Sequence, residues 1–170
     1  MKLLINGVMM SVLSIVLMTL LTLSITEVHA EKFDMPNKSE QISAQQELVD
    51  IFFAAAKTGN NKVIREFLKY GFPVDVKNTK GFTPLMMASY YGQKDVVNIL
   101  LQNGANRCER DNKGNTALMG AIFKLEWGIA KQLREVDCDV AAKQKGQKTT
   151  AEFARVIGQA DKLEALENED

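Results

Sequence analysis

The chain repeats itself at intervals of 33 residues, and this period limits its fold more than any other feature of the sequence. Several series of positions carry the same or a similar residue at that interval. They are Ala55, Ala88, Ala121 and Ala154; Thr83, Thr116 and Thr149; Phe67, Leu100, Leu133 and Leu166; and Gly59, Gly92 and Gly158, with Leu125 where a glycine is expected. An interval of this length is typical of a unit of two short helices and a turn that recurs along the chain.

The clearest unit predicts its own helix boundaries. Thr83 is placed to cap the free backbone amides at the start of a helix, and Pro84 suits the first helical position because it lacks an N–H group. Gly92 would end that helix, since glycine adopts a left-handed backbone without steric cost. We therefore expect one helix over 83–91 and a second, with one apolar face, over 94–102.

Residues 81–106, GFTPLMMASYYGQKDVVNILLQNGAN, resemble one whole repeat of the ankyrin repeat family. The resemblance implies an all-α solenoid of about four helix–turn–helix units with degenerate terminal caps. The repeat domain would cover 43–166, in units of about 43–78, 79–111, 112–143 and 144–166. A polar linker over 31–42 would precede this domain, and an acidic tail over 167–170 would follow it.

Departures from the family pattern predict where the stack is irregular. The family usually has a histidine after Thr-Pro-Leu, and Met86 and Met119 stand in its place, so we expect a looser turn. The third unit has Ala117 in place of the proline, and Leu125 and Asp137 in place of two glycines. These changes predict a distorted third unit.

The first and last units lack Thr-Pro-Leu, as expected for caps that need a polar outer face. Ser43 and Gln46 have the spacing of a capping box, in which each side chain bonds to the backbone amide of the other residue. This pair predicts a first helix over about 44–57.

Residues 1–30 have the composition of a secretory signal peptide. Lys2 precedes an apolar run from Leu3 to Ile25, and Val-x-Ala places small side chains before a cleavage point after Ala30. We therefore expect a periplasmic or secreted protein that meets a membrane only through this segment, before cleavage. An uncleaved anchor is the alternative, because the run is near the ~20 residues that span a bilayer.

Export would place Cys108 and Cys138 in an oxidising compartment, where cysteines pair. A disulfide requires their Cα atoms to lie within about 7 Å, which the sequence alone does not establish. Free, buried thiols are the alternative.

Charge and histidine content exclude several classes of function. Lysine plus arginine and aspartate plus glutamate number 21 each, so the net charge is zero and nucleic acid is not an expected partner. The single histidine, His29, would be removed with the signal peptide. A mature chain without histidine excludes histidine-based catalysis and the common histidine-containing zinc sites. We expect no enzyme activity, no cofactor and no metal. A hydrolase that uses carboxylates is the enzymatic alternative, although Asp137 and Asp139 are interpreted as ordinary loop residues.

Two short segments resemble ligand-binding motifs only superficially. Residues 145–150 lack the earlier glycine of a phosphate-binding loop. Residues 111–115 have the alternating pattern of a calcium loop, but Lys113 takes a ligand position and the distal glutamate is missing. We interpret the second segment as a turn.

The resemblance implies a binding surface on the concave side, built from the turns and the exposed sides of the first helices. Carried over to this chain, that surface contains Thr79, Lys80, Phe82, Tyr90, Tyr91, Asn112, Lys113, Asn115, Phe123 and Lys124. The outer units would add Lys57, Thr58, Lys148, Val156 and Ile157. The four aromatic residues in the first set are the expected anchors, because aromatic side chains supply much of the energy of protein interfaces.

The predicted function is a non-enzymatic, monomeric module that binds another protein through its concave face in the periplasm, and so blocks or stabilises it. An immunity protein that neutralises a toxin effector is the first interpretation. An accessory protein for an envelope enzyme such as a catalase is an alternative, and so is a secreted effector directed at a host.

Overall fold

The computed structural model describes residues 37–168, apart from the side chain of Glu167. Backbone contacts divide the chain into two units, Met1–Glu40 and Gln41–Asp170, and the architecture below is that of the second. The predicted signal peptide, residues 31–36 of the predicted linker and the end of the predicted tail lie outside the described residues. Within the described part, each helix is too short or too polar to cross a membrane.

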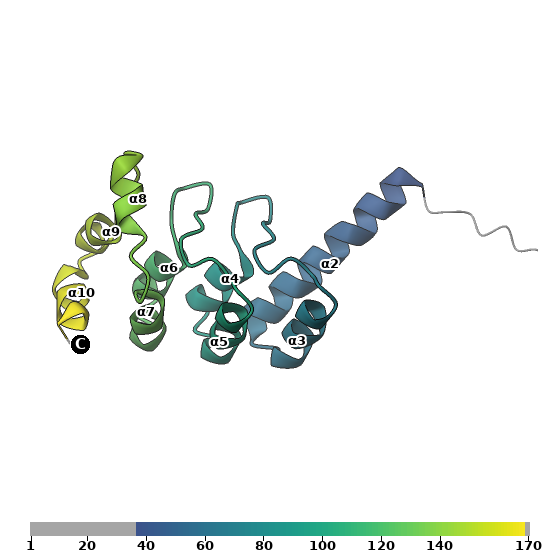
Figure 1. Cartoon of the computed structure of the whole chain (residues 1–170), viewed down its shortest axis with the longest axis horizontal. Coiled ribbons are helices and arrows are strands. Elements are labelled where there is room, and N and C mark those ends of the chain that lie inside the picture. Colours follow the sequence, from purple (N-terminus) through teal and green to yellow (C-terminus); the bar gives the residue numbers. More distant parts are fainter. Residues whose placement is uncertain (1–36, 169–170) are drawn as a thin grey trace, which may run out of the picture. The chain divides into compact units, whose positions relative to one another are not determined.

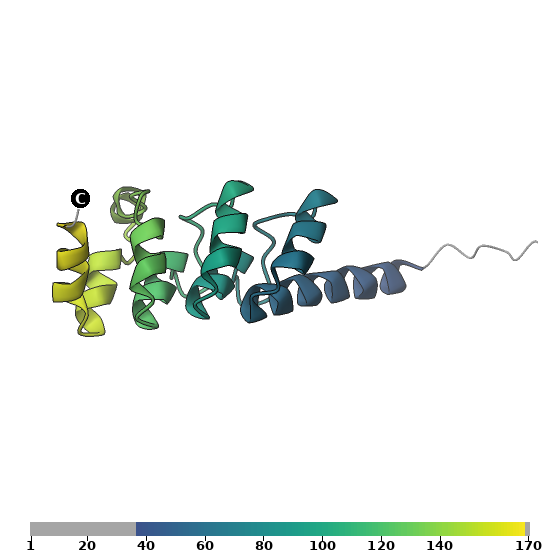
Figure 2. The same cartoon turned by 90° about the horizontal axis from the view of Figure 1, so that it is seen from below.

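The regular elements among residues 37–168 are all helices, which confirms the predicted all-α class. In chain order they are α2 (Lys38–Thr58), α3 (Asn61–Lys69), α4 (Pro84–Tyr90), α5 (Lys94–Gln102), α6 (Ala117–Phe123), α7 (Trp127–Leu133), α8 (Asp139–Gln144), α9 (Thr150–Val156) and α10 (Ala160–Glu167). Figures 1 and 2 show two rows of short helices, with α4, α6 and α9 in one row and α3, α5, α7 and α10 in the other. Each row is formed by successive repeats, so the helices stack as a solenoid.

The core contains the repeating apolar positions of the sequence. The side chains of Ala55, Ala88, Ala121 and Ala154 are all at most 5% exposed, and so are Leu100, Leu133 and Leu166. Small alanines at equivalent positions allow the helices of neighbouring repeats to approach closely, and the leucines fill the space between the rows.

The same cap begins the first helix of three repeats. The hydroxyl oxygens of Thr83, Thr116 and Thr149 each accept a hydrogen bond from the backbone amide three residues later, at 3.3, 3.3 and 3.1 Å. Each bond satisfies an amide that the helix itself leaves free. Pro84 takes the first position of α4, as predicted.

Met86 closes the turn of the second repeat from the other direction. The Thr83 amide donates a hydrogen bond to Met86 Sδ at 3.5 Å, so the two residues form both halves of a capping box. Both side chains are buried. The turn of the second repeat is therefore closed by two bonds, although the missing histidine predicted a looser one. The turn with Met119 in the third repeat has the Thr116 cap without a capping box.

The turn after the first helix has the same backbone in the second and third repeats. Gly92 follows α4 with a φ of 71°, the left-handed conformation that was predicted. Leu125 follows α6 at the equivalent position with a φ of 62°. The third repeat therefore keeps the turn of the second, at the steric cost of a leucine side chain in the left-handed region.

The first helix begins earlier than predicted. α2 starts at Lys38, and Asn37 Oδ1 accepts hydrogen bonds from two amides of its first turn, both at 3.0 Å. Ser43 thus lies inside the helix, and the Gln46 side chain donates to Asp50 Oδ1 at 2.9 Å. The predicted capping box is wrong, and the predicted linker is helical from Lys38 onward.

The sequence analysis did not predict α8, which lies at the end of the third repeat. The Asp139 carboxylate accepts hydrogen bonds from the Thr150 amide at 2.7 and 2.9 Å, which ties α8 to the start of α9. Directly before α8, Cys138 forms a disulfide with Cys108, with the Cα atoms 5.2 Å apart. The disulfide joins the loop of the second repeat to the end of the third.

Candidate functional site

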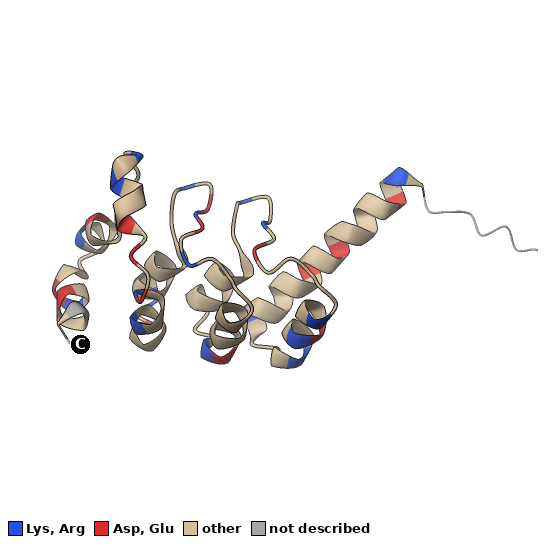
Figure 3. Cartoon of the chain, viewed as in Figure 1, with Lys and Arg blue, Asp and Glu red and all other residues tan. Residues whose placement is uncertain are grey.

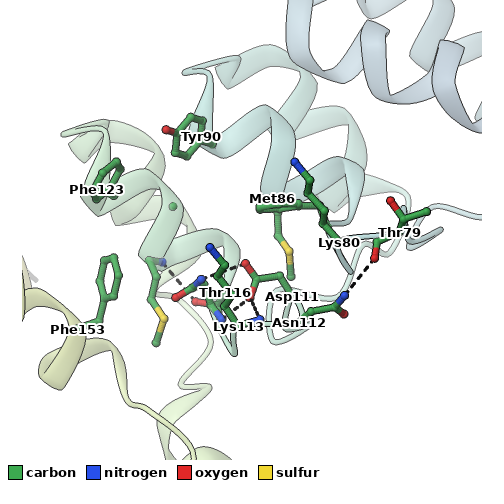
Figure 4. A pocket seen from close by; sticks show the side chains of 14 residues that line it. Thr79, Lys80, Met86, Tyr90, Asp111, Asn112, Lys113, Thr116, Phe123 and Phe153 are labelled. Atoms are coloured by element: carbon green, nitrogen blue, oxygen red, sulfur yellow. Dashed lines mark hydrogen bonds between the residues drawn. The ribbon is translucent and has the colours of Figure 1, made fainter.

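A groove of about 730 Å³ opens between the turns that precede α4 and α6 and the exposed sides of α4, α6 and α9 (Figure 4). We call this cavity the groove and define it by its lining residues. These are Thr79, Lys80, Phe82, Met86, Tyr90, Asp111, Asn112, Lys113, Asn115, Thr116, Met119, Gly120, Phe123 and Phe153. All of them belong to the unit Gln41–Asp170.

Gly120 is the glycine among the residues that line the groove. It lies within α6 at the position that Met87 holds in the second repeat and Phe153 in the fourth. A Cβ atom at Gly120 would meet the Cβ of Tyr90 at 3.9 Å and the backbone oxygen of Met86 at 4.0 Å, both ordinary van der Waals contacts, so a side chain can be added here without a clash at its Cβ. Met86 and Met119 line the groove beside it and are otherwise buried.

Aromatic rings form one side of the groove. The rings of Tyr90 and Phe123 are stacked, with centroids 6.1 Å apart and an angle of 15° between their planes. In the view of Figure 4, these two rings and that of Phe153 follow one another along one side of the cavity, and Thr79 and Lys80 lie across from them. Neighbouring repeats thus place apolar surface side by side, because Tyr90 and Phe123 occupy the same position of the 33-residue period.

Hydrogen bonds between successive loops fix the opposite side. Asn112 Nδ2 donates a hydrogen bond to the backbone oxygen of Thr79, in the loop of the preceding repeat, at 3.1 Å. Asn115 Oδ1 accepts a bond from Lys148 Nζ at 2.7 Å, so the loop of the third repeat is also held to that of the fourth. Side chains held in this way lose little conformational freedom when a partner binds.

Asp111 is the single carboxylate among the residues that line the groove. It is 8% exposed, and its oxygens accept hydrogen bonds from the amides of Lys113 and Asn115, both at 2.8 Å, and from the Asn115 side chain at 3.0 Å. This pattern is that of an aspartate that shapes a turn, as interpreted from the sequence. A hydrolytic pair of carboxylates would need a second acid here, and the lining residues provide none.

Two carboxyl groups outside the lining have shifted pKa values. Burial raises the pKa of Asp75, and the hydrogen bond from the Asn106 amide acts in the opposite direction. The amide and hydroxyl of Thr149 donate to Glu152 and lower its pKa. The shift of Asp75 arises from burial, and that of Glu152 arises from the cap that begins α9. Residues 37–168 contain no cluster of three or more histidine, cysteine, aspartate or glutamate side chains suited to a metal.

The groove brings together most of the surface predicted from the sequence. Its lining contains the predicted residues Thr79, Lys80, Phe82, Tyr90, Asn112, Lys113, Asn115 and Phe123. Tyr91 and Lys124 lie just outside the lining. The ring of Tyr91 packs edge-on against Tyr90, and Lys124 Nζ lies 5.2 Å from the centroid of the Tyr90 ring.

Of the residues predicted in the outer units, some lie near the groove and others do not. Lys148 contacts the groove, since its Nζ lies 5.2 Å from the ring centroid of Phe153. Lys57 Nζ lies 5.1 Å from the ring centroid of Tyr91, and Thr58 donates its hydroxyl to a backbone oxygen of α2. Val156 and Ile157 are absent from the lining, and Ile157 packs against the core.

The sequence analysis missed several residues that line the groove. They are Met86, Asp111, Thr116, Met119, Gly120 and Phe153. Met86 and Met119 are buried, but each also lines the groove. The series Met87, Gly120 and Phe153 was present in the 33-residue period and would have located the hollow at Gly120.

Comparison with known proteins places this scaffold in a family. The family model for ankyrin repeats, in three copies, matches residues 51–144. The chain is 32% identical over 114 residues to ankyrin repeat and SAM domain-containing protein 6 of Mus musculus, a match that covers 66% of this chain and 13% of the mouse protein.

Two further relatives share shorter segments. The chain is 39% identical over 80 residues to a potassium channel of Arabidopsis thaliana, with 47% of this chain and 10% of the channel covered. It is also 39% identical over 54 residues to an ankyrin repeat protein of Pseudomonas aeruginosa, with 32% of each protein covered. The chain thus spans at most about a third of the length of these relatives. Ankyrin repeats are protein-binding modules, and this chain belongs to the ankyrin repeat family.

Proposed function

We propose that this protein is an exported, non-enzymatic module that holds a segment of a partner protein in the groove as a monomer, and thereby blocks or stabilises that partner. The observation that carries the proposal is the groove itself. It combines apolar rings and methionine side chains with a polar rim on a scaffold whose family binds proteins. A cavity of this composition favours the binding of another molecule, since it offers both apolar area and hydrogen-bonding groups.

The groove is suited to binding without rearrangement. On its polar side, the loops of successive repeats are held to one another by the hydrogen bonds of Asn112 and Asn115. A preformed surface of this kind requires little ordering when a partner docks, so more of the contact energy remains as affinity. By covering part of the partner's surface, the bound protein would then block or stabilise the partner without any reaction of its own.

Export is supported by two independent features of the chain. Residues 1–30 have the composition of a secretory signal, and Cys108 is bonded to Cys138. Disulfides persist in oxidising compartments such as the periplasm and are rare in reducing ones. A partner in the same compartment is the consequence, with a toxin neutralised by an immunity protein as the first candidate and an envelope enzyme as the second.

The partner is tested by photo-crosslinking in the cells that produce the protein. A benzophenone amino acid replaces Phe123, which lines the groove, or Tyr70, which is 79% exposed and lies outside it. The proposal expects a discrete adduct with one protein from position Phe123 and none from Tyr70. Equal adducts from both positions, or no adduct from Phe123, would refute binding through the groove.

Export is tested by thiol alkylation of intact cells. In an oxidising compartment, Cys108 and Cys138 resist a thiol reagent until a reductant is added. Full alkylation without reductant would mean that the protein resides in a reducing compartment, and the export proposal would fail.

A further inference from the structure

We infer that the segment held in the groove is acidic, with large apolar side chains flanked by aspartate or glutamate. This inference rests on the proposed function and specifies the chemistry of the partner at the same site. It follows from three properties of the groove: the sign of its free charges, the state of its one carboxylate and the exposure of its rings.

The free charges at the groove are positive. Lys80 and Lys113 line it and are exposed, and the ion pairs found among the described residues involve neither of them. Lys124 and Lys148 lie beside it, each with its ammonium group 5.2 Å from the centroid of an aromatic ring that lines the cavity. Figure 3 shows both basic and acidic residues along the loops before α4 and α6 and on α8.

The carboxylate of Asp111 offsets this charge only in part. Its oxygens are engaged by three internal hydrogen bonds and are buried, so a partner meets the exposed ammonium groups of Lys80 and Lys113 first. The lining thus holds two exposed lysines and one buried carboxylate, and Lys124 and Lys148 add two ammonium groups at its edge, although the whole chain has a net charge of zero. Charge complementarity therefore favours an acidic partner segment.

The interior of the groove selects for apolar side chains. Tyr90, Phe123 and Phe153 form one side, and Met86, Met119 and Gly120 also line the cavity. Methionine side chains adapt to apolar groups of different shape, and Gly120 adds no side chain that would occupy this space. A segment that fills this space with an apolar residue and places carboxylates near Lys80 and Lys113 satisfies both parts of the groove.

The arrangement of the rings favours a peptide over a single-stranded nucleic acid, although lysines and aromatic rings occur in both kinds of site. Base stacking needs an open ring face. Here Tyr90 and Phe123 stack on each other, and Lys124 and Lys148 cover ring faces of Tyr90 and Phe153. The remaining ring edges suit contact with aliphatic and aromatic side chains.

The test is selection from a library of short random peptides displayed on phage, with the purified protein as target. The inference expects the selected peptides to carry a net negative charge relative to the input library and to place acidic residues beside large apolar ones. Their affinity should fall with rising salt and be largely lost near 1 M, where the Debye length is about 3 Å.

Two groove variants separate the parts of the site. Gly120→Met places in the groove the side chain that Met87 has at the equivalent position, and should abolish binding while raising helix stability. Lys80→Glu combined with Lys113→Glu should weaken binding about tenfold or more at low salt and have little effect at high salt. The controls are Lys62→Glu, an exposed lysine of α3, and Tyr70→Ala, an exposed aromatic residue, which should leave binding unchanged.

The outcomes distinguish this inference from the proposed function. Peptides that lose binding in Gly120→Met but carry no excess of acidic residues would overturn the acidic partner and leave the protein-binding groove intact. A failure to select peptides, or peptides indifferent to Gly120→Met, would overturn both. Displacement of the selected peptides by oligothymidylate would identify single-stranded nucleic acid as the occupant and refute the inference.

Discussion

The second repeat (79–111) and the third (112–143) have nearly the same fold but reach it by different means. The second has the local signals of its family: Pro84 at the start of α4 and Gly92 after its end. The third has Ala117 and Leu125 at those positions, yet its first helix is also capped by a threonine and its following turn has the same left-handed backbone. Tertiary contacts therefore impose on the third repeat a shape that its local sequence specifies weakly.

The disulfide accounts for part of this difference. Cys108 and Cys138 are 30 residues apart, and the segment between them contains both α6 and α7. The covalent bond thus encloses the repeat with the weaker local signals. By restricting the unfolded chain over that segment, it lowers the entropy that the third repeat loses when it folds.

Removal of the disulfide is expected to have the largest effect on stability. For a loop of 30 residues, Cys108→Ala combined with Cys138→Ala should lower the free energy of unfolding by about 3.5 kcal/mol. Urea denaturation measures the loss, and hydrogen exchange shows its location, with α6 and α7 less protected relative to α4. The reduced wild-type protein is the control and should match the variant. A uniform loss of protection would mean that the bond does not favour the third repeat.

Core truncation tests whether the third repeat is packed as well as the second. Leu100 and Leu133 are equivalent positions, 0% and 1% exposed. Replacement of either by alanine should cost about 3 kcal/mol, since both side chains are removed from filled surroundings. Urea titration of the two variants gives the comparison directly. A cost at Leu133 below half of that at Leu100 would reveal a looser core in the third repeat.

Much of the fold could be predicted because it depends on short-range signals. The threonine caps, Pro84 and Gly92 act within one or two turns of helix, and the alanine and leucine series mark the core by period alone. The prediction of where α2 starts was wrong because two cap signals compete in that region. Asn37 caps the helix, and the weaker Ser43 signal lies inside it.

Features that depend on contacts between repeats could not be predicted. α8 is tied to α9 by the bond from the Thr150 amide to Asp139, and the disulfide depends on how closely two loops approach. Eight of the 14 residues that line the groove were predicted, because the resemblance to ankyrin repeats implies which surface binds. The part that Gly120 plays in the lining was not predicted.

Substitution of the turn residues Gly92 and Leu125 should change the free energy of unfolding by a smaller amount, with opposite signs in the two repeats. Leu125→Gly should stabilise the protein by about 1 kcal/mol, because it relieves a left-handed backbone on a 55% exposed leucine. Gly92→Leu should destabilise it by about 1.5 kcal/mol, since it introduces that strain and places a Cβ atom 2.6 Å from Glu126 Oε1. Thermal denaturation of both variants measures the pair. Loss of stability in Leu125→Gly would show that the leucine contributes more by packing than it costs by conformation.

The smallest expected effect distinguishes the caps by their response to pH. The second repeat closes its capping box with the uncharged sulfur of Met86, and the fourth closes the same motif with the carboxylate of Glu152. Bonds from Thr149 lower the pKa of Glu152, so its contribution to stability is complete above the ordinary glutamate pKa and is lost as the pH falls through the lowered value.

Acidification should therefore loosen the start of α9 before the start of α4. Amide exchange at Thr149 and Thr83, followed by NMR as the pH is lowered, measures the two caps in the same sample. In Glu152→Gln the side-chain oxygen still accepts the Thr149 bond but does not titrate in this range, so the pH dependence at Thr149 should disappear. Equal responses at both caps would mean that the whole stack, and not the Glu152 carboxylate, governs the opening of α9.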